Sequence, residues 1–339
     1  MNKEMIIVKI AINGFGRIGR LVYRLMEEDD FFDVVAINDL SSSEELAYLL
    51  KYDSTHRNYD KEVTYDDDGI IVNGKKTRIY AEADPSLLPW RELGVDLVFE
   101  CTGRFTDLDS AMLHIKAGAK KVIVSAPCKG DVKTVVYNVN DDIIDNDDKV
   151  ISAASCTTNC LAPVLKVLDD NFGIARGFMT TVHAYTNDQA TLDVPHKKGI
   201  KARRGRACAI NIVPTSTGAA KAIGKVIPSL DGKLAGGALR VPVQDGSLVD
   251  LSLELLEKVT EEEVNSMFLN NVNDTLKATY DPIVSSDIIG NKCGSLVDLS
   301  LTKVLESDGK QMVKVVAWYD NEMGYSMQMV RTAKRFLSK

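Results

Sequence analysis

The chain is predicted to be an α/β protein of two domains, one with a doubly wound parallel sheet and one with an α+β fold and a mostly antiparallel sheet. Up to residue 125, strand-like apolar runs alternate with helical stretches, which is the pattern of a parallel sheet covered by helices. The second half carries longer strand-like runs with fewer helices between them. The length of 339 residues also exceeds the usual size of a single hydrophobic core.

We expect the first domain over residues 1–155, completed by a C-terminal helix at 321–339, and the second domain over 156–320. An apolar content of 45% and a charged content of 26% are those of an ordinary globular protein. The net charge of −7 provides no general attraction to nucleic acid or to an anionic membrane. No apolar run approaches the roughly 20 residues that span a bilayer. The six cysteines are scattered and include no CxxC pair, so we expect a reduced, cytoplasmic setting without a metal site.

A glycine motif follows the first predicted strand. The strand Ile6–Ile12 leads into Asn13–Gly19, which reads G-x-G-x-x-G around Phe15, Arg17 and Ile18. In such a motif Gly14 allows a tight turn and Gly16 lets the backbone approach a pyrophosphate. The last glycine of the motif lets the following helix pack against the strand.

The residues after the motif complete a dinucleotide-binding pattern. A helix is expected over Leu21–Glu28, and the strand Asp33–Asp39 ends in an acid 20 residues after Gly19. A pyrophosphate would rest on the N-terminus of the helix. The Asp39 carboxylate accepts hydrogen bonds from ribose hydroxyls and repels a 2′-phosphate, which favours NAD over NADP. This order of elements predicts a Rossmann-type NAD site.

The remainder of the first half continues the alternation. The expected elements are a hairpin at Glu62–Tyr65 and Ile70–Val72, strands at Val95–Glu100 and Lys121–Ser125, and a helix at Asp109–Ala117. Ligands bind at the carboxyl ends of the strands in parallel sheets, so Ser125 and the turn at Thr102-Gly103 are candidates for the cofactor wall.

A cysteine stands at a predicted junction between a strand and a helix. The stretch Ser152–Cys160 separates the strand-like run Lys149–Ile151 from the helical run Leu161–Leu168. A helix N-terminus stabilises a thiolate, so the pKa of Cys156 is expected to fall. A structural cysteine in a tight turn is the alternative interpretation at this point.

The second half contains long strands and one long loop. The expected strands are Phe178–Tyr185, Ala238–Glu257 with a turn at 244–246, Ser295–Val304 and Met312–Tyr319, before a last helix at Met327–Leu337. About 25 residues between Tyr185 and Ile210 lack periodicity, and loops of that length are usually functional. Six positive charges lie within Lys197–Arg206. No aromatic residues are interleaved with them, which disfavours nucleic acid; a small anion, a subunit contact and a solvated loop face stay open.

Three further features suggest chemistry. His183 lies on a strand that leads into the long loop, and a cysteine with a histidine is a common nucleophile–base pair. The helix that starts within Thr215–Ile223 begins with hydroxyls and a glycine, which suits an anion. Arg240 stands within the strand Leu239–Val241, which suggests a positioned charge.

Together these stretches resemble the phosphorylating glyceraldehyde-3-phosphate dehydrogenase family, and the similarity runs essentially from end to end. The matching stretches are Asn13–Gly19, Ser152–Cys160, His183–Gln189, Asn211–Ala222, Leu239–Pro242 and Trp318–Ser326. The resemblance implies a cytoplasmic, glycolytic homotetramer that uses NAD and no metal. It implies that the Cys156 thiolate attacks the aldehyde, that His183 is the base for hydride transfer, and that inorganic phosphate releases a thioester as an acyl phosphate.

The resemblance also implies binding residues. Thr186 and Arg240 would hold the phosphate of the substrate. The attacking phosphate would be held by Ser155, Thr157, Arg204, Thr217 and Gly218. NAD would contact Asn13, Gly14, Phe15, Gly16, Arg17, Ile18, Asp39, Ser125 and Asn321, with Tyr325 near the nicotinamide.

Some positions depart from the family pattern, and two other functions are compatible with parts of the sequence. Ala83, Asn138 and Cys101 replace the usual residues, so effects on NAD affinity or stability are expected from them. Erythrose-4-phosphate dehydrogenase shares this scaffold but hydrolyses its thioester with water, and the complete phosphate set argues against it. A secondary RNA-binding or surface-interaction role is the alternative from another class.

Overall fold

The structure is a computed structural model that describes residues 7–197 and 199–339. The chain divides into two compact units. One comprises the chain up to Val135 with Asp141–Ala154 and Met329–Lys339, and the other comprises Val136–Asn140 and Ser155–Gln328. Ile6 in the first predicted strand and Lys198 in the basic loop lie outside the described residues.

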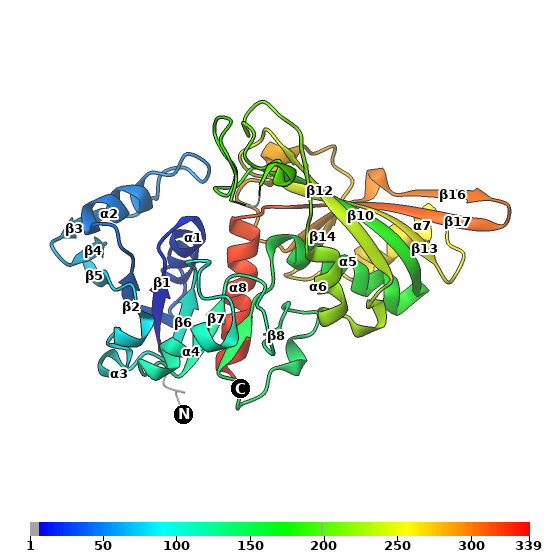
Figure 1. Ribbon diagram of the computed structural model, residues 1–339. Coiled ribbons are helices and arrows are strands. Elements are labelled where there is room, and N and C mark those ends of the chain that lie inside the picture. The colour runs from blue at the N-terminus through cyan, green and yellow to red at the C-terminus, as the bar shows by residue number, and fades with distance from the viewer. Residues whose placement is uncertain (1–6, 198) are drawn as a thin grey trace. The chain divides into compact units, whose positions relative to one another are not determined.

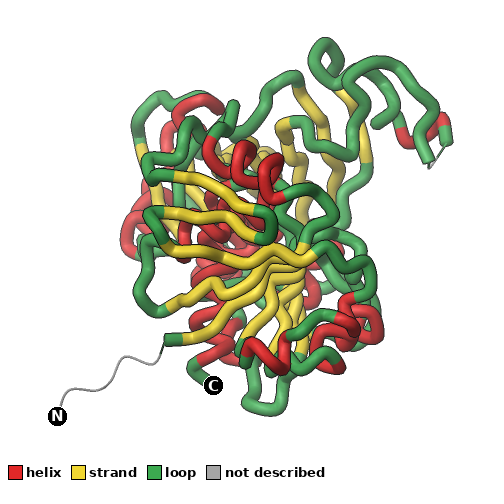
Figure 2. Tube along the Cα trace, turned by 90° about the vertical axis from the view of Figure 1, so that its left-hand side faces the viewer, coloured by secondary structure: helices red, strands yellow, loops and turns green. Residues whose placement is uncertain are grey.

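The first unit contains a sheet of nine described strands in the order β3-β4-β5-β2-β1-β6-β7-β9-β8. These are β1 (Val8–Asn13), β2 (Phe32–Asn38), β3 (Val63–Asp66), β4 (Gly69–Val72), β5 (Lys75–Tyr80), β6 (Leu97–Glu100), β7 (Lys121–Val124), β8 (Lys133–Thr134) and β9 (Val150–Ser152). Figure 1 labels β1 to β8, and Figure 2 shows strands as yellow tubes running side by side. From β5 to β8 all neighbours are parallel, which confirms the predicted parallel sheet.

The predicted hairpin is confirmed as the antiparallel pair β3 and β4, and β5 joins it as a further strand that the pattern did not indicate. Helices α1 (Arg17–Met26), α2 (Ser43–Lys51), α3 (Trp90–Leu93) and α4 (Leu108–Lys116) also belong to this unit. α1 begins directly after Gly16, four residues earlier than predicted. α2 was not predicted, although Ser42 and Glu45 form a capping box at its start.

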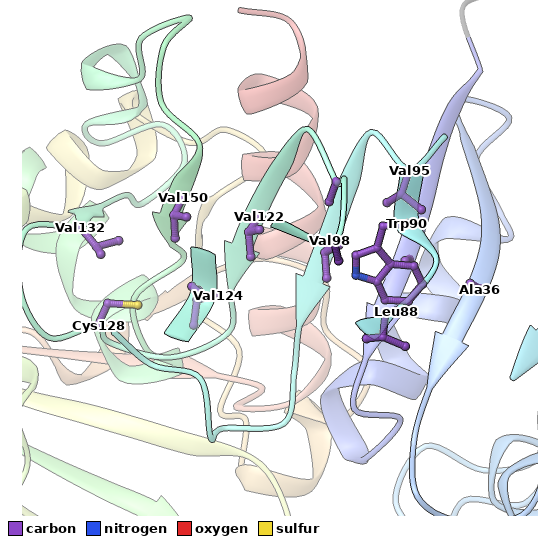
Figure 3. Packing of buried hydrophobic residues seen from close by; sticks show 14 residues of the cluster. Ala36, Leu88, Trp90, Val95, Val98, Val122, Val124, Cys128, Val132 and Val150 are labelled. Atoms are coloured by element: carbon purple, nitrogen blue, oxygen red, sulfur yellow. The ribbon is translucent and has the colours of Figure 1, made fainter. Parts of the chain in front are cut away.

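The core of the first unit lies against the parallel sheet. Trp90 is fully buried beside Leu88, Val95 and Val98, as Figure 3 shows. Valines of β7 and β9 continue the same cluster along the sheet. Strands that are buried on both faces read as unbroken apolar runs, so their apolar sequences made them predictable.

The second unit contains a sheet of eight described strands in the order β11-β12-β10-β13-β17-β15-β14, with β16 beside β17. These are β10 (Ile174–Ala184), β11 (Val213–Thr215), β12 (Leu234–Val241), β13 (Ser247–Leu255), β14 (Leu276–Thr279), β15 (Ser295–Asp298), β16 (Lys303–Ser307) and β17 (Lys310–Tyr319). Most neighbours are antiparallel, whereas β10 with β12 and β14 with β15 are parallel. The sheet is therefore mixed and mostly antiparallel.

Helices α5 (Cys156–Phe172), α6 (Ala219–Val226) and α7 (Glu261–Asn270) belong to the second unit, and α8 (Met323–Leu337) begins in it. α5 and α6 pack against the sheet and against each other (Figure 1). Met179, Thr181 and His183 of β10 are buried, whereas Phe178 on the opposite face is 67% exposed. Alternate side chains of β10, His183 among them, therefore lie on the buried face of the strand.

The expected strand Ser295–Val304 is wrong as a single element. A 3₁₀ turn at Leu299–Leu301 divides it, because the Asp298 carboxylate accepts hydrogen bonds from the backbone and hydroxyl of Ser300. Other 3₁₀ turns cover Pro85–Leu87, Asp141–Ile143, Ile200–Ala202, Pro228–Leu230 and Ser285–Ile288. Within the described ranges, no helix has both the length and the apolar character needed to cross a membrane.

Candidate active site

Cys156 is the first residue of α5, and Ser155 caps this helix. The Ser155 hydroxyl accepts a hydrogen bond from the backbone N–H of Thr158 at 3.1 Å, which satisfies one of the N–H groups that a helix leaves unpaired at its start. Ala154 has a φ of +59°, a left-handed conformation that is rare outside glycine and concentrates at functional sites. Cys156 is partly exposed, whereas the residues that follow it are buried.

His183 meets Cys156 from β10. Its Nε2 atom lies 3.5 Å from the Cys156 Sγ atom. The parallel pairing of β10 with β12 places His183 directly opposite Arg240. The ring of Tyr319 contacts the imidazole edge to face, at 5.9 Å between ring centroids. Three strands and one helix N-terminus therefore position the predicted nucleophile and base.

The hydrogen bonds of His183 determine which nitrogen carries its proton. Nδ1 lies 2.7 Å from the backbone carbonyl oxygen of Ala184, which can only accept a hydrogen bond. Nδ1 is therefore protonated, and Nε2, facing Cys156, presents a lone pair. Arg240 Nη1 is 3.0 Å from Nδ1, but it donates to Ala184 O at 2.9 Å and to Thr186 Oγ1 at 3.0 Å. This tautomer is the one that a general base toward Cys156 requires.

The surroundings of the pair favour the neutral form of each residue. Burial, with the Arg240 charge, lowers the pKa of His183 to about 3. Burial raises the pKa of Cys156, although Arg240 and Thr157 act in the opposite direction. The expectation of a lowered cysteine pKa at the helix N-terminus is therefore wrong for this state, because desolvation outweighs the favourable charges. Activation must come from proton transfer to Nε2 as the sulfur attacks.

A chain of buried hydrogen bonds links Thr157 to Tyr319 and Thr181. Thr181 Oγ1 donates to the carbonyl of Leu248 at 3.0 Å, so it must accept from Tyr319 Oη at 2.9 Å. The Tyr319 oxygen must then accept from Thr157 Oγ1, also at 2.9 Å. The Thr157 hydroxyl proton is thus committed, and a phosphate contact from Thr157 requires its backbone N–H or a rotated hydroxyl. Sequence reasoning did not single out Tyr319; its place at the end of a predicted strand was the available signal.

Cationic and hydroxyl groups extend from His183 along the loop. Arg240 donates to Thr186, and its buried Nε atom makes no hydrogen bond within the described chain. Arg204 donates through Nε to Thr215 Oγ1 at 3.1 Å and through Nη1 to the Asp188 carboxylate. The Thr186 hydroxyl donates to the same carboxylate. The structure therefore links Arg240 and Thr186 to Arg204 through Asp188, a residue that sequence reasoning missed.

Thr217 and Gly218 stand at the start of α6. The Thr217 hydroxyl accepts from the backbone N–H of Ala219 at 3.2 Å. Gly218 is the capping residue, and no described atom lies within 4 Å of where its side chain would be. Thr217 lies two residues beyond Thr215, the hydroxyl that Arg204 contacts. The space beside Gly218 is open, and the binding of an anion at this helix start stays a prediction.

A separate pocket of about 310 Å³ lies at the carboxyl ends of β1, β2 and β6 in the first unit. It is lined by Asn13, Gly14, Gly16, Asn38, Asp39, Leu40, Glu82, Ala83, Cys101, Thr102, Arg104 and Phe105. Four of the residues predicted to bind NAD are among them. The pocket also includes Ala83 and Cys101, two of the positions that depart from the family pattern.

The glycine loop has the geometry that a pyrophosphate requires. Gly14 has a φ of +90°, and a side chain at Gly19 would come within 2.2 Å of the Gly14 carbonyl oxygen. No described atom lies within 4 Å of the position that a Gly16 side chain would take, so the backbone is open to a ligand there. Asp39 accepts from the backbone N–H of Phe15 at 2.8 Å, which ties the acid to the loop. These residues fit a dinucleotide.

A buried polar network supports Asn13 in this pocket. The Trp90 indole N–H donates to His114 Nδ1 at 3.0 Å, so His114 is protonated on Nε2 and donates to Glu100 Oε2 at 3.1 Å. Asn13 Nδ2 and the backbone N–H of Thr102 donate to the same carboxylate. Glu100 is 1% exposed and His114 is fully buried. Sequence reasoning found neither, because strand and helix interiors rarely carry ionisable side chains for function.

The other predicted cofactor residues have varied surroundings. Arg17 and Ile18 occupy the first turn of α1, where Arg17 pairs with Asp53 at 2.6 Å. Ser125 follows β7 and lies beside the Cys101 thiol. In the second unit, Asn321 is buried and accepts from the Ser247 hydroxyl at 2.6 Å, and Tyr325 is 5% exposed in α8. The roles of these residues stay predictions.

Comparisons with known proteins find two matching family models and several similar sequences. Residues 8–108 match the model of the glyceraldehyde 3-phosphate dehydrogenase NAD binding domain, and residues 155–321 match that of its C-terminal domain. The chain is 55% identical over 328 residues to glyceraldehyde-3-phosphate dehydrogenases of Clostridium pasteurianum and Clostridium acetobutylicum, covering 97% of this chain and 98% of each relative. The enzyme of Streptococcus pyogenes is 54% identical over 331 residues, with the same coverage.

Proposed function

Because this chain belongs to the glyceraldehyde 3-phosphate dehydrogenase family, we propose that Cys156 and His183 carry out the chemistry of the family reaction. Family membership makes the chain an NAD-dependent oxidoreductase with a glycolytic role. The observation that carries the assignment is the 3.5 Å approach of His183 Nε2 to Cys156 Sγ, with Nδ1 held by Ala184 O. A nucleophile next to an oriented base is the arrangement that covalent catalysis requires.

The NAD site is proposed in the glycine loop and pocket of the first unit, with Asn13, Gly14, Phe15, Gly16 and Asp39 as its best-supported residues. Arg17, Ile18, Ser125, Asn321 and Tyr325 complete the predicted set. NAD supplies a hydride acceptor when it is bound. The proposed domains are residues 1–155 with 321–339 for the cofactor and 156–320 for catalysis.

His183 can serve as the only base in the oxidation. As Cys156 Sγ bonds to the aldehyde carbon, its proton moves to Nε2 and then to the alkoxide, which gives a hemithioacetal. Nε2 next removes that hydroxyl proton while hydride leaves the carbon, and a thioester remains. Both transfers use one lone pair, so His183 must be neutral at the start, in agreement with its lowered pKa.

Phosphate then completes the reaction. The Arg240 guanidinium and Thr186 are proposed to hold the phosphate of the substrate, supported by the buried Nε atom of Arg240 that lacks a partner within the described chain. Ser155, Thr157, Arg204, Thr217 and Gly218 are proposed to hold the attacking phosphate. One phosphate oxygen bonds to the thioester carbon as the bond to Sγ breaks, and an acyl phosphate leaves. The backbone N–H of Cys156 and His183 would stabilise the oxyanions.

A homotetramer in a reduced, cytoplasmic setting is the proposed state. Large apolar side chains are exposed on β10 and the long loop, where Ile200 is 95% exposed and Ile210 is 80% exposed, as expected for surfaces that associate. None of the six cysteines forms a disulfide within the described ranges. Sedimentation velocity of the purified chain would measure the oligomeric state directly.

The decisive experiment follows NADH formation from glyceraldehyde 3-phosphate and NAD, with and without inorganic phosphate. Without phosphate we expect about one NADH per active site, because the thioester accumulates; phosphate should make formation continuous. Continuous turnover without phosphate would mean hydrolysis of the thioester by water, as in erythrose-4-phosphate dehydrogenase. No NADH under either condition would contradict the assignment.

A further inference from the structure

Asp188 touches the binding groups of both proposed phosphate sites. It lies in the turn that follows β10, five residues after His183. One carboxylate oxygen accepts from the Thr186 hydroxyl, and the other accepts from Arg204 Nη1. Thr186 belongs to the proposed site for the phosphate of the substrate, and Arg204 to the site for the attacking phosphate.

The hydrogen bonds run in one direction toward this carboxylate. Arg240 Nη1 donates to Thr186 Oγ1 at 3.0 Å, so the single hydroxyl proton of Thr186 is available for Asp188. Arg204 donates to the other oxygen of the same carboxylate. The Asp188 carboxylate thus accepts hydrogen bonds both from Thr186, which itself accepts from Arg240, and from Arg204. A phosphate oxygen needs the same donors in the same orientation.

The charges are also balanced within the chain. Arg204 and Arg240 carry two positive charges beside a neutral His183, and the Asp188 carboxylate cancels one of them. Partial burial raises the pKa of Asp188, but the Thr186 hydrogen bond and the Arg204 charge lower it overall, so the group is ionised at neutral pH. About two fifths of the side chain is exposed, at 41%, which leaves the carboxylate a route to water.

We propose that Asp188 is an internal substitute for phosphate, occupying Thr186 and Arg204 in the ligand-free chain and releasing them when phosphate binds. This inference rests on the proposed function of the two anion sites. The carboxylate returns to both donors as the phosphorylated product leaves. Asp188 therefore weakens phosphate binding and speeds product release.

A structural role for Asp188 predicts the opposite result. If the carboxylate merely held Arg204 in place, its removal would loosen the guanidinium and weaken phosphate binding. If the carboxylate competes with phosphate, its removal must strengthen binding, because one donor and one positive charge are set free. The sign of the change in affinity separates the two roles.

The test is calorimetric titration of the purified full chain with inorganic phosphate at pH 7 and constant ionic strength. Asp188→Asn should lower the Kd by about tenfold, as expected when a like charge next to a bound dianion is removed. Asp188→Ser must also lower the Kd. Agreement between the two variants shows that the change comes from loss of the carboxylate and not from an effect of one substitution on folding. An unchanged or raised Kd in both variants would overturn the inference.

Asp193→Asn is the matched control. Asp193 lies in the same loop and also pairs with an arginine, at 3.0 Å from Arg206 Nε, so its substitution changes the net charge equally. We expect its Kd to stay within about twofold of the parent value, because exposed charges are screened over such distances. An effect as large as that of Asp188→Asn would mean that net charge alone sets the affinity, and would overturn the inference.

Turnover supplies an independent readout. Asp188→Asn should lower the KM for phosphate and lower kcat through slower product release, whereas a loosened Arg204 would raise the KM. The proposed phosphate sites are tested separately, by Arg204→Gln and Arg240→Gln in the same titration. If neither variant weakens phosphate binding, the sites themselves are misassigned and the inference falls with them. If both weaken binding and Asp188→Asn does not tighten it, only the inference fails.

Discussion

His183 Nε2 lies 3.5 Å from Cys156 Sγ, and the geometry around the imidazole leaves that nitrogen unprotonated. The contact joins the first residue of α5 to a residue of β10 that lies 27 positions later in the chain. It therefore depends on the packing of α5 against the sheet.

Cys156→Ser should abolish oxidation of glyceraldehyde 3-phosphate, because a hydroxyl is a far weaker nucleophile and is not deprotonated at neutral pH. NADH formation in single-turnover and steady-state assays measures the loss. Cys208→Ser is the matched control, since Cys208 is also unpaired and partly exposed but lies in the loop. Normal turnover in Cys156→Ser would exclude Cys156 as the nucleophile.

His183→Asn should slow hydride transfer by about 10²–10⁴-fold, the usual contribution of a general base. Rapid-mixing measurement of the first NADH formed isolates this step from product release. His196→Asn, which replaces a loop histidine, should leave the rate unchanged. An unaltered first turnover in His183→Asn would mean that another group removes the proton.

Stability should fall in acid because of His183. Its pKa is lowered to about 3 in the folded chain by burial and by Arg240, against about 6.5 when unfolded. Between these two pH values the unfolded chain binds more protons than the folded chain. The contribution of His183 to the free energy of unfolding is therefore fully present above pH 6.5, and it is lost at up to ~1.4 kcal/mol per pH unit as the pH falls toward 3. Urea unfolding of the parent and of His183→Asn at pH 7 and pH 4.5 gives the difference. Equal pH dependence in both would contradict this.

Tyr319→Phe should lower the free energy of unfolding by about 1–3 kcal/mol, because the Thr157 hydroxyl loses its acceptor and Thr181 loses its donor in a buried place. Urea denaturation measures the change. Tyr280→Phe is the control, since the Tyr280 side chain is exposed. A Tyr319→Phe variant as stable as the control would show that the hydroxyl chain contributes nothing.

Glu100→Gln should weaken NAD binding and shift the fluorescence of Trp90. An amide presents a donor toward Asn13 or His114, so one buried donor loses its acceptor, at a cost of about 1–3 kcal/mol. Equilibrium titration with NAD and the tryptophan emission spectrum give two readouts. Glu92→Gln, on the exposed side of α3, should change neither. If Glu100→Gln keeps the NAD affinity and the tryptophan emission of the parent, the hydrogen bonds of Glu100 do not support Asn13 in the pocket.

Features that depend on neighbouring residues in the chain were predictable. The strand, glycine loop, helix and acid from Val8 to Asp39 follow one another directly, so their spacing determines how they line the pocket of the first unit. The helix start at Cys156 and the hydroxyls before α6 also depend only on residues that are adjacent in the chain, so they were predictable as well. Helix α2 was missed even though its capping box is local, because its apolar residues form one unbroken run, Leu46–Leu50, and do not show the spacing of an amphipathic helix.

Side-chain chemistry and short-range spacing are properties of the chain alone, and they establish which residues can react and which cofactor suits the glycine loop. How those residues act on one another depends on the packing of distant segments. Pairing β10 with β12 set Arg240 opposite His183, and the fold of the loop brought Asp188 to Arg204. Burial then reversed the expected pKa shift of Cys156. Desolvation and long-range hydrogen bonds arise only when distant segments pack together, so no local pattern in the chain encodes them.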